Sequence, residues 1–240
     1  MSGVFRLLGE PRFGGVLVVS DHAGNAVPDD IHLGVAPRLL DEHMGLDIGV
    51  GPVGARLAER PGFAAFQCVC SRLVCDVNRE AGAPGAVPAA SDGHAVPGNM
   101  LDEAARAARI ARFHTPYHEA LAALLDRVPP ALILSLHSFT PRLATSTEAR
   151  PWQVGVLYNE DDRAARIAIA LLEAEGLIVG DQQPYSGRLL NYTMNRHAEA
   201  EGRPYLGIEV RQDQIADAAG QARWADLLHR LCNRVALAMG

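Results

Sequence analysis

The sequence predicts an α/β protein whose strands form a largely parallel sheet. Short apolar runs of strand length alternate with longer patterns of helical period, and turn residues bound most of the runs. This alternation is typical of parallel strands joined by crossover helices, since a tight turn cannot join parallel neighbours. No composition shift marks a boundary and we find no repeat of solenoid length, so we expect a single domain over residues 1–240.

Each predicted element follows from its residue pattern. The predicted strands are apolar runs between turn residues, at 16–20, 64–70, 131–136, 153–158 and 205–210. The predicted helices span 39–59, 102–127, 162–175 and 219–238. Pro116 is expected to interrupt the second helix, because the residue before a proline is biased away from helical backbone. The stretches 80–99 and 140–151 are long loops, which in a compact domain are either disordered or cover an active site.

Composition and charge narrow the function classes. Hydrophobic residues make up 48% of the chain and charged residues 21%, as in an ordinary globular enzyme. The formal net charge of −6 argues against a dedicated nucleic-acid binder, which would carry a basic stripe. An anionic substrate would therefore have to be bound by a local cluster of arginines.

The sequence leads us to expect a cytoplasmic protein, monomeric or homodimeric, without a nucleic-acid or membrane partner. Its first residues lack the pattern of a secretory signal, and no apolar run approaches the roughly 20 residues that span a bilayer. The 4 cysteines do not suggest a disulfide framework in a chain of this size. Cys68, Cys70 and Cys75 lie close together, but their spacing is not a usual zinc spacing, and buried cysteine behaves as a small hydrophobe.

Polar and ionisable residues gather at the ends of four predicted strands. In an open α/β sheet, ligands bind in the crevice outside the carboxyl ends of the strands. A single histidine at such a place is more often structural, but two histidines together with a glutamate and paired arginines indicate a catalytic site. The motifs are SDHAGN at 20–25, SR…DVNR at 71–79, SLHS at 135–138 and GIEVR at 207–211.

His22 and His137 are candidate metal ligands. Neutral imidazole binds zinc well, and a hydrolytic zinc site needs three protein ligands and a water. A carboxylate would supply the third ligand, with Asp47, Glu42 and Asp21 as candidates. Bound zinc lowers the pKa of its water towards about 7, which provides a nucleophile at neutral pH.

Glu209 and the arginines supply the other functions that a hydrolase needs. Glu209 ends an apolar strand and can act as general base, or it can be a structural partner of Arg211. Arg72 and Arg79 bracket LVCDVN, and guanidinium groups suit bidentate recognition of a carboxylate, although either can instead pair with Asp76. Arg211 is a further candidate for substrate binding.

At this point the chain resembles the N-formylglutamate amidohydrolases, and most of all their broadly distributed, less characterised branch. The shared motifs occur in family order: HAGN-x-VP at 22–28, LD-x-G at 46–49, SRLV-x-D-x-NR at 71–79, LHS at 136–138 and IE at 208–209. The resemblance covers roughly residues 15–215, and the SR…D-x-NR element is its most specific part. It implies a three-layer αβα sandwich with a mixed, largely parallel sheet. That fold is related to the zinc carboxypeptidases and to the aspartoacylase and succinylglutamate desuccinylase group.

The resemblance also implies an activity and its residues. The activity is zinc-dependent hydrolysis of N-formyl-L-glutamate, or of another N-acyl group on an acidic amino acid. By motif position, the metal ligands are His22 and His137, the catalytic carboxylate is Glu209, and the substrate-binding residues are Arg72, Asn78 and Arg79. Zinc is the expected ion, although another divalent metal would suit the same residues.

The third ligand departs from the carboxypeptidase pattern. Those enzymes use H-x-x-E, and this chain has Asn25 at the fourth position. The resemblance indicates Asp47 instead, because a similar dipeptide precedes a helix in the formylglutamate enzymes.

Other readings compete with a zinc hydrolase. Gly49, Gly51 and Gly54 match G-x-G-x-x-G, which predicts a dinucleotide-binding oxidoreductase if a strand comes directly before it, but the preceding DEHMGLDI is charged. His114 and His118 have a spacing that can bind zinc, but neither precedes a glutamate. A deacylase for another N-acyl amino acid and a non-catalytic binding module also remain possible. In the segment before the last strand, Tyr192 and Arg196 either contact substrate or anchor a loop.

Overall fold

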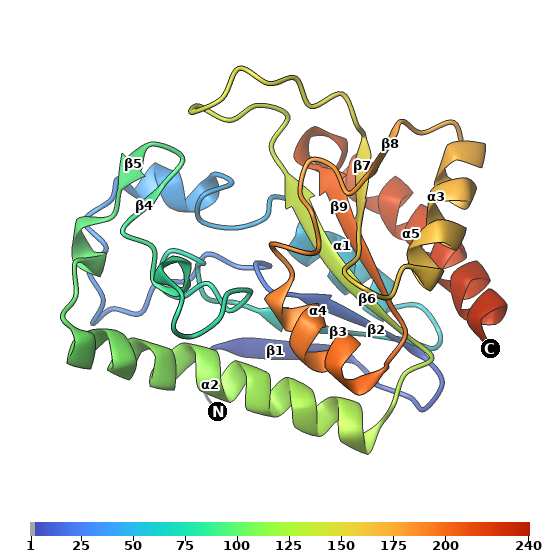
Figure 1. Cartoon of the computed structure of the whole chain (residues 1–240), viewed down its shortest axis with the longest axis horizontal. Coiled ribbons are helices and arrows are strands. Elements are labelled where there is room, and N and C mark those ends of the chain that lie inside the picture. The colour runs from blue at the N-terminus through green and yellow to red at the C-terminus, as the bar shows by residue number, and fades with distance from the viewer. Residues whose placement is uncertain (1–2) are drawn as a thin grey trace.

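The computed structural model describes residues 3–240 and has three layers, with one mixed sheet between two layers of helices (Figure 1). The sheet has 7 strands in the order β1-β3-β2-β6-β9-β7-β8. Its four central strands run parallel, whereas β1 and β7 run antiparallel to their inner neighbours and β8 pairs parallel with β7. The strands are β1 Phe5–Gly9, β2 Val16–Ser20, β3 Phe63–Cys68, β6 Leu132–Phe139, β7 Val154–Leu157, β8 Val179–Asp181 and β9 Tyr205–Arg211. The predicted α/β class with a largely parallel sheet is confirmed.

The helices divide between the two faces of the sheet. On one face α1 and α3 pack against α5, and on the other the long α2 packs against α4 (Figure 1). Their bounds are α1 Val50–Ala58, α2 Glu103–Arg127, α3 Arg163–Ala174, α4 Tyr192–His197 and α5 Ala218–Met239. Short 3-10 helices occur at η1 Pro37–Asp41, η2 Pro84–Ala86, η3 Pro97–Asn99, η4 Glu199–Glu201 and η5 Gln212–Gln214. Within residues 3–240, no helix has the length and apolarity to cross a bilayer.

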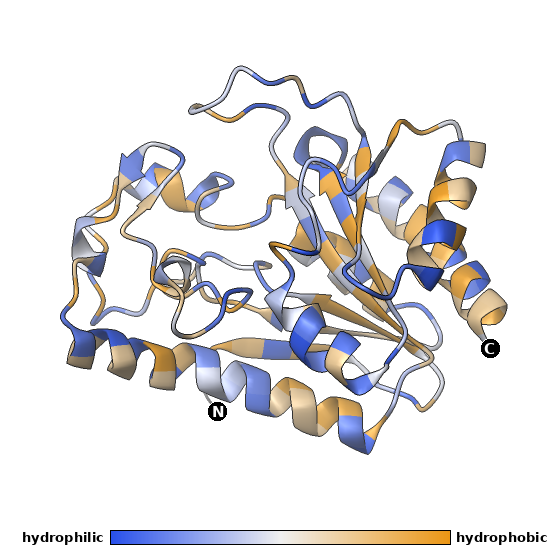
Figure 2. Cartoon of the chain, viewed as in Figure 1, coloured by the Kyte–Doolittle hydropathy of each residue, from blue (hydrophilic) through white to orange (hydrophobic). Residues whose placement is uncertain are grey.

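Burial explains which strands the sequence predicted. Every residue of β2, β3 and β6 is buried, as expected of parallel strands covered on both faces, and these strands appear as apolar ribbons in Figure 2. The predicted strands therefore all exist. The edge strands β1 and β8 were not predicted, because β1 is largely exposed and β8 has only 3 residues.

The predicted helix over 39–59 is wrong over its first half. Only α1 is α-helical there, because Gly49 at its N-cap has a left-handed backbone with φ of 81°. A Cβ on Gly49 would lie 2.2 Å from the Ile215 carbonyl oxygen, so this position has no room for a side chain. The residues before Gly49 form a loop that carries Asp47 towards the end of β2.

Pro116 does not interrupt α2, contrary to the prediction. The helix continues through the proline, and the buried Phe113 and Tyr117 on either side of it hold both turns against the sheet. Tertiary packing thus overrides the local preference against helix at a proline. The short helix α4 was not predicted either.

Candidate active site

A cavity of about 400 Å³ opens at the carboxyl end of the central strands. It brings together side chains from four sequence motifs that lie far apart along the chain. Of the predicted site residues, those that line it are His22, Asp47, Arg72, Asn78, Arg79, His137 and Glu209. The register of β6 and β9 places His137 directly beside Glu209. The remaining walls come from the loops 85–92 and 139–145 and from Tyr185 and Leu190.

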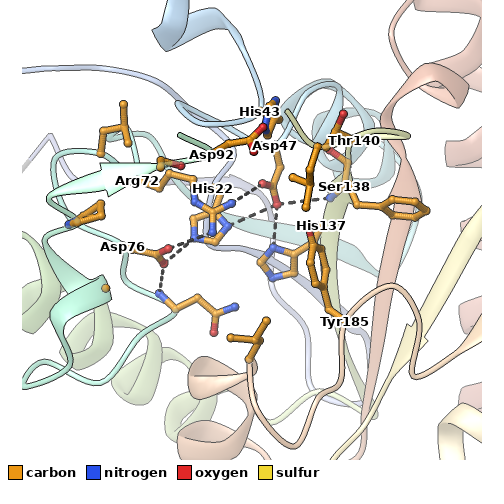
Figure 3. Close-up of a pocket in the computed structure, with 18 of the residues that line it drawn as sticks. His22, His43, Asp47, Arg72, Asp76, Asp92, His137, Ser138, Thr140 and Tyr185 are labelled. Atoms are coloured by element: carbon orange, nitrogen blue, oxygen red, sulfur yellow. Dashed lines mark hydrogen bonds and ion pairs between the residues drawn. The ribbon is translucent and has the colours of Figure 1, made fainter. Parts of the chain in front are cut away.

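His22, Asp47 and His137 form a buried group that can hold a metal ion. Each offers one ligand atom, and these atoms lie within 4.8 Å of one another. His22 Nδ1 lies 3.4 Å from Asp47 Oδ2, and His137 Nδ1 lies 2.9 Å from the same oxygen. Figure 3 shows both rings directed at this carboxylate. Two imidazoles and a carboxylate form a donor set of the kind that binds catalytic zinc.

The outer nitrogens of both histidines face buried carboxylates. His22 Nε2 donates to Asp76 Oδ1 over 2.7 Å, and His137 Nε2 lies 3.3 Å from Asp21 Oδ2 without good hydrogen-bond alignment. Such outer carboxylates are common partners of metal-ligating histidines, because they fix the ring tautomer and orientation. His22 Nδ1, although buried, has no hydrogen-bond partner within residues 3–240. A divalent cation would satisfy that atom, so the residues present fit a metal.

Arg72 bridges two of these carboxylates. Its Nη1 lies 3.1 Å from Asp47 Oδ1 and its Nη2 lies 3.0 Å from Asp76 Oδ2. Burial opposes the ionisation of Asp76, but the charges of His22 and Arg72 outweigh it and hold the pKa of Asp76 well below its usual value. Arg72 therefore orders the surroundings of the metal group.

Replacing Asp76 by asparagine should weaken metal binding without removing a ligand. The change takes away the charged acceptor of His22 and one of the two partners of Arg72. Loss of an outer-sphere partner typically costs about 10–100-fold in metal affinity. A competition titration with a zinc-binding dye measures the effect, and Asp213→Asn, which removes a surface partner of Arg211, is the matched control. Equal affinities of the two variants would contradict this prediction.

Glu209 has the properties of a general acid or base. Its side chain is only 8% exposed, and Oε2 has no hydrogen-bond partner in the described part of the chain. Burial raises the pKa of Glu209 to about 7, with nearby His137 acting in the opposite direction. Opposite it, β7 carries Gly155, where a Cβ would lie 3.4 Å from that of Glu209. A carboxyl group with a pKa near neutrality can accept and return a proton under physiological conditions.

The predicted substrate-binding residues differ in what the structure does with them. Arg79 donates to the Asn78 carbonyl over 2.8 Å and otherwise extends along the cavity wall. The Asn78 side-chain oxygen accepts from the Thr193 amide over 3.0 Å.

Arg211 does not line the cavity, contrary to the prediction of a substrate-binding role. Its guanidinium pairs with Asp213 at 2.7 and 3.1 Å and with three carbonyls at residues 150–152. Its donors are used up at the base of the 140–151 loop.

The sequence did not reveal the residues that hold the site from beneath. Thr193 on α4 and Tyr117 on α2 both donate to Asp21 Oδ1, over 2.9 and 2.7 Å. Asp21 is thereby fixed beside His137. The only sequence signal for Tyr117 and Thr193 was their apolar surroundings, which say nothing about a hydrogen bond between distant elements.

A buried histidine cluster supports the loop that carries Asn78 and Arg79. His118 Nε2 donates to the Val77 carbonyl and His114 Nε2 to the Arg79 carbonyl, each over 2.9 Å. His197 donates to His118 Nδ1, and burial lowers the pKa of His118 to about 3, so the ring stays neutral. Neither His114 nor His118 lines the cavity, and the hydrogen-bonding role fits better than a metal-binding one.

The two long loops meet at the rim of the cavity. Asp92, in the hairpin of β4 Ala90–Ser91 and β5 His94–Ala95, accepts from His43 Nε2 over 3.0 Å. Asp92 also accepts from the Ala144 and Thr145 amides over 3.0 and 3.1 Å. Both loops therefore form walls of the site, as one of the two alternatives for them required.

The glycine motif has a packing explanation. No strand directly precedes α1, so the order of elements for dinucleotide binding is missing. A Cβ on Gly51 would lie 2.7 Å from the Ala23 carbonyl oxygen, and one on Gly54 would lie 2.3 Å from Gln67 Nε2. These glycines let α1 approach the sheet closely. The cysteines are likewise free and buried, as expected of core residues.

The comparisons with known proteins agree with this geometry. A model of the family "N-formylglutamate amidohydrolase" matches residues 14–216. The chain belongs to this family. An Agrobacterium tumefaciens gene product of known structure is 30% identical, with a TM-score of 0.91 over 98% of this chain and 96% of that one.

A more distant structure shares the fold of this N-formylglutamate amidohydrolase family member. It is the N-formylglutamate amidohydrolase of Ralstonia eutropha JMP134, which is 22% identical, with a TM-score of 0.78 over 99% of this chain and 98% of that one. A comparison with curated proteins finds no match. Membership of the family makes hydrolysis of an amide the expected reaction class.

Proposed function

We propose that this protein is a zinc-dependent amidohydrolase that removes the acyl group from an N-acyl amino acid. N-formyl-L-glutamate is the reference substrate, because it names the family. One observation supports the proposal above all others: a buried His22–Asp47–His137 group lies beside the unpaired carboxyl of Glu209 in a single cavity. Metal ligands and an adjacent proton carrier are what hydrolysis of an amide by activated water requires.

Zinc, when held by the three ligands, supplies a Lewis acid that polarises the amide carbonyl and lowers the pKa of water. Glu209 removes a proton from the attacking water and delivers it to the amine nitrogen as the C–N bond breaks. Its pKa of about 7 suits both transfers, since the same group must accept and then give up the proton. The products are the free acid, formate in the reference case, and the amino acid.

Asn78 and Arg79 orient the substrate. Arg79 offers a guanidinium for bidentate binding of a substrate carboxylate, and Asn78 is held at its side by Thr193. The histidine cluster fixes the backbone of this loop, so the two side chains are in place before a substrate arrives.

A hydrolysis screen with zinc added and removed tests the proposal. The substrates are N-formyl, N-acetyl and N-succinyl amino acids, and release of the free amine is measured. We expect turnover of at least one N-acyl amino acid, its loss after treatment with a chelator, and its recovery on addition of zinc. Turnover that is insensitive to chelation would contradict the metal-dependent mechanism, and no turnover of any substrate would contradict hydrolysis.

A further inference from the structure

The supply of positive charge in the cavity is unusually easy to follow. The chain contains no lysine, so all 22 of its basic side chains other than histidine are arginines. Among residues 3–240, only Arg72 and Arg79 bring a guanidinium to the cavity lining. Four carboxylates line the same cavity: Asp47, Asp76, Asp92 and Glu209.

One of the two arginines is already occupied. Arg72 is committed to Asp47 and Asp76, at 3.1 and 3.0 Å, and these contacts use one end of each of its two terminal nitrogens. Its side chain is 24% exposed. Arg79 makes a single hydrogen bond, to a backbone carbonyl, and within the described residues its other donors have no partner. Only one guanidinium is thus free to receive a substrate carboxylate as a fork.

The other cations near the cavity are also engaged. His43 is bound to Asp92 at 3.0 Å. Arg150 lies outside the lining, where it stacks 5.0 Å from the centre of the Tyr185 ring and donates to the Tyr185 hydroxyl and the Thr140 carbonyl. Tyr185 therefore presents its ring to the cavity, with the charge of Arg150 beyond it.

The rest of the cavity wall is neutral and largely apolar. Leu143 and Leu190 line it together with Tyr185, Phe139 and Leu73. A second substrate carboxylate placed against this wall would lose its water without gaining a cation. Burial of an unpaired charge is far more costly than burial of an apolar group of the same size, which is instead favourable.

We propose that the enzyme prefers an N-acyl amino acid that carries one carboxylate and an uncharged, apolar side chain. The carboxylate binds Arg79, and the side chain contacts the wall formed by Leu143, Tyr185 and Leu190. This substrate class rests on the proposed hydrolysis of N-acyl amino acids, and it differs from the acidic amino acid that the sequence led us to expect.

Three compounds of similar length test the preference: N-formyl-L-methionine, N-formyl-L-glutamine and N-formyl-L-glutamate. With the zinc-loaded full-length protein, kcat/KM should be highest for methionine and lowest for glutamate, and these two should differ by at least about tenfold. Calorimetric titration of the Glu209→Gln variant with the same compounds should give affinities in the same order. A higher kcat/KM or a higher affinity for the glutamate compound overturns the proposal.

The two readouts separate this inference from the proposed function. If none of the compounds is turned over, hydrolysis is contradicted, and the order of affinities alone decides the substrate preference. Binding of none of the three overturns the preference as well.

Two variants locate the carboxylate and the side chain. Arg79→Gln should weaken all three compounds by a similar factor, because each has one carboxylate at Arg79. A loss confined to the glutamate compound would place its side chain there and overturn the proposal. Leu143→Arg should reduce the preference for methionine over glutamate, whereas Leu143→Gln, which removes apolar surface without adding charge, should not bring glutamate forward. An unchanged preference in Leu143→Arg would remove this wall from the side-chain site.

Discussion

The Glu209→Gln variant is expected to lose about 10²–10⁴-fold in kcat while it keeps its metal. Glutamine has the same shape and fills the same space beside His137, but it cannot take a proton from water. Because Glu209 Oε2 has no hydrogen-bond partner within residues 3–240, the substitution breaks no structural hydrogen bond at that atom. Steady-state kinetics and metal analysis of the same preparation measure both halves of the prediction.

The surface residue Glu173 on α3 supplies the matched control. Glu173→Gln makes the same chemical change on an exposed helix far from the cavity, and its kinetics should equal those of the unaltered protein. Full activity of Glu209→Gln would contradict the assignment of the proton carrier. Loss of metal from Glu209→Gln would show instead that the residue helps to hold the ion.

Asp47→Ala is expected to abolish stoichiometric metal binding. The carboxylate lies between the two histidine rings, and without it the ion would keep only two protein ligands, fewer than the three of a catalytic zinc site. The loss should exceed the about 10–100-fold effect expected for Asp76→Asn, which removes only an outer partner. Inductively coupled plasma analysis after dialysis against a weak chelator gives the metal content.

Glu42→Ala is the informative partner of that experiment, since sequence reasoning left Glu42 open as the third ligand. Its carboxylate lies on the surface, 3.4 Å from Arg38, and we expect this variant to retain metal. Metal retained in Asp47→Ala and lost in Glu42→Ala would reverse the assignment. His22→Ala should behave like Asp47→Ala, because it removes another member of the same group.

The sequence by itself determined the class of the fold and the places where chemistry was to be sought. Buried parallel strands such as β2 and β6 are continuous apolar runs, so they are visible without any knowledge of their neighbours. The polar residues that follow them, His22 and His137 among them, must lie at one edge of the sheet because parallel strands end there together. Elements with weak burial, such as β1 and α4, left no comparable pattern.

Only the tertiary structure decided which side chains meet. Asp21, Glu42 and Asp47 were equivalent candidates because spacing does not reveal the path of a loop. The left-handed backbone at Gly49 ends that loop and directs Asp47 to the histidines, while Asp21 is taken by Tyr117 and Thr193. The same holds for the arginines. Arg72, Arg79 and Arg211 are alike in the sequence, and they differ only in whether carboxylates from distant segments have already claimed them, which is a property of long-range contacts.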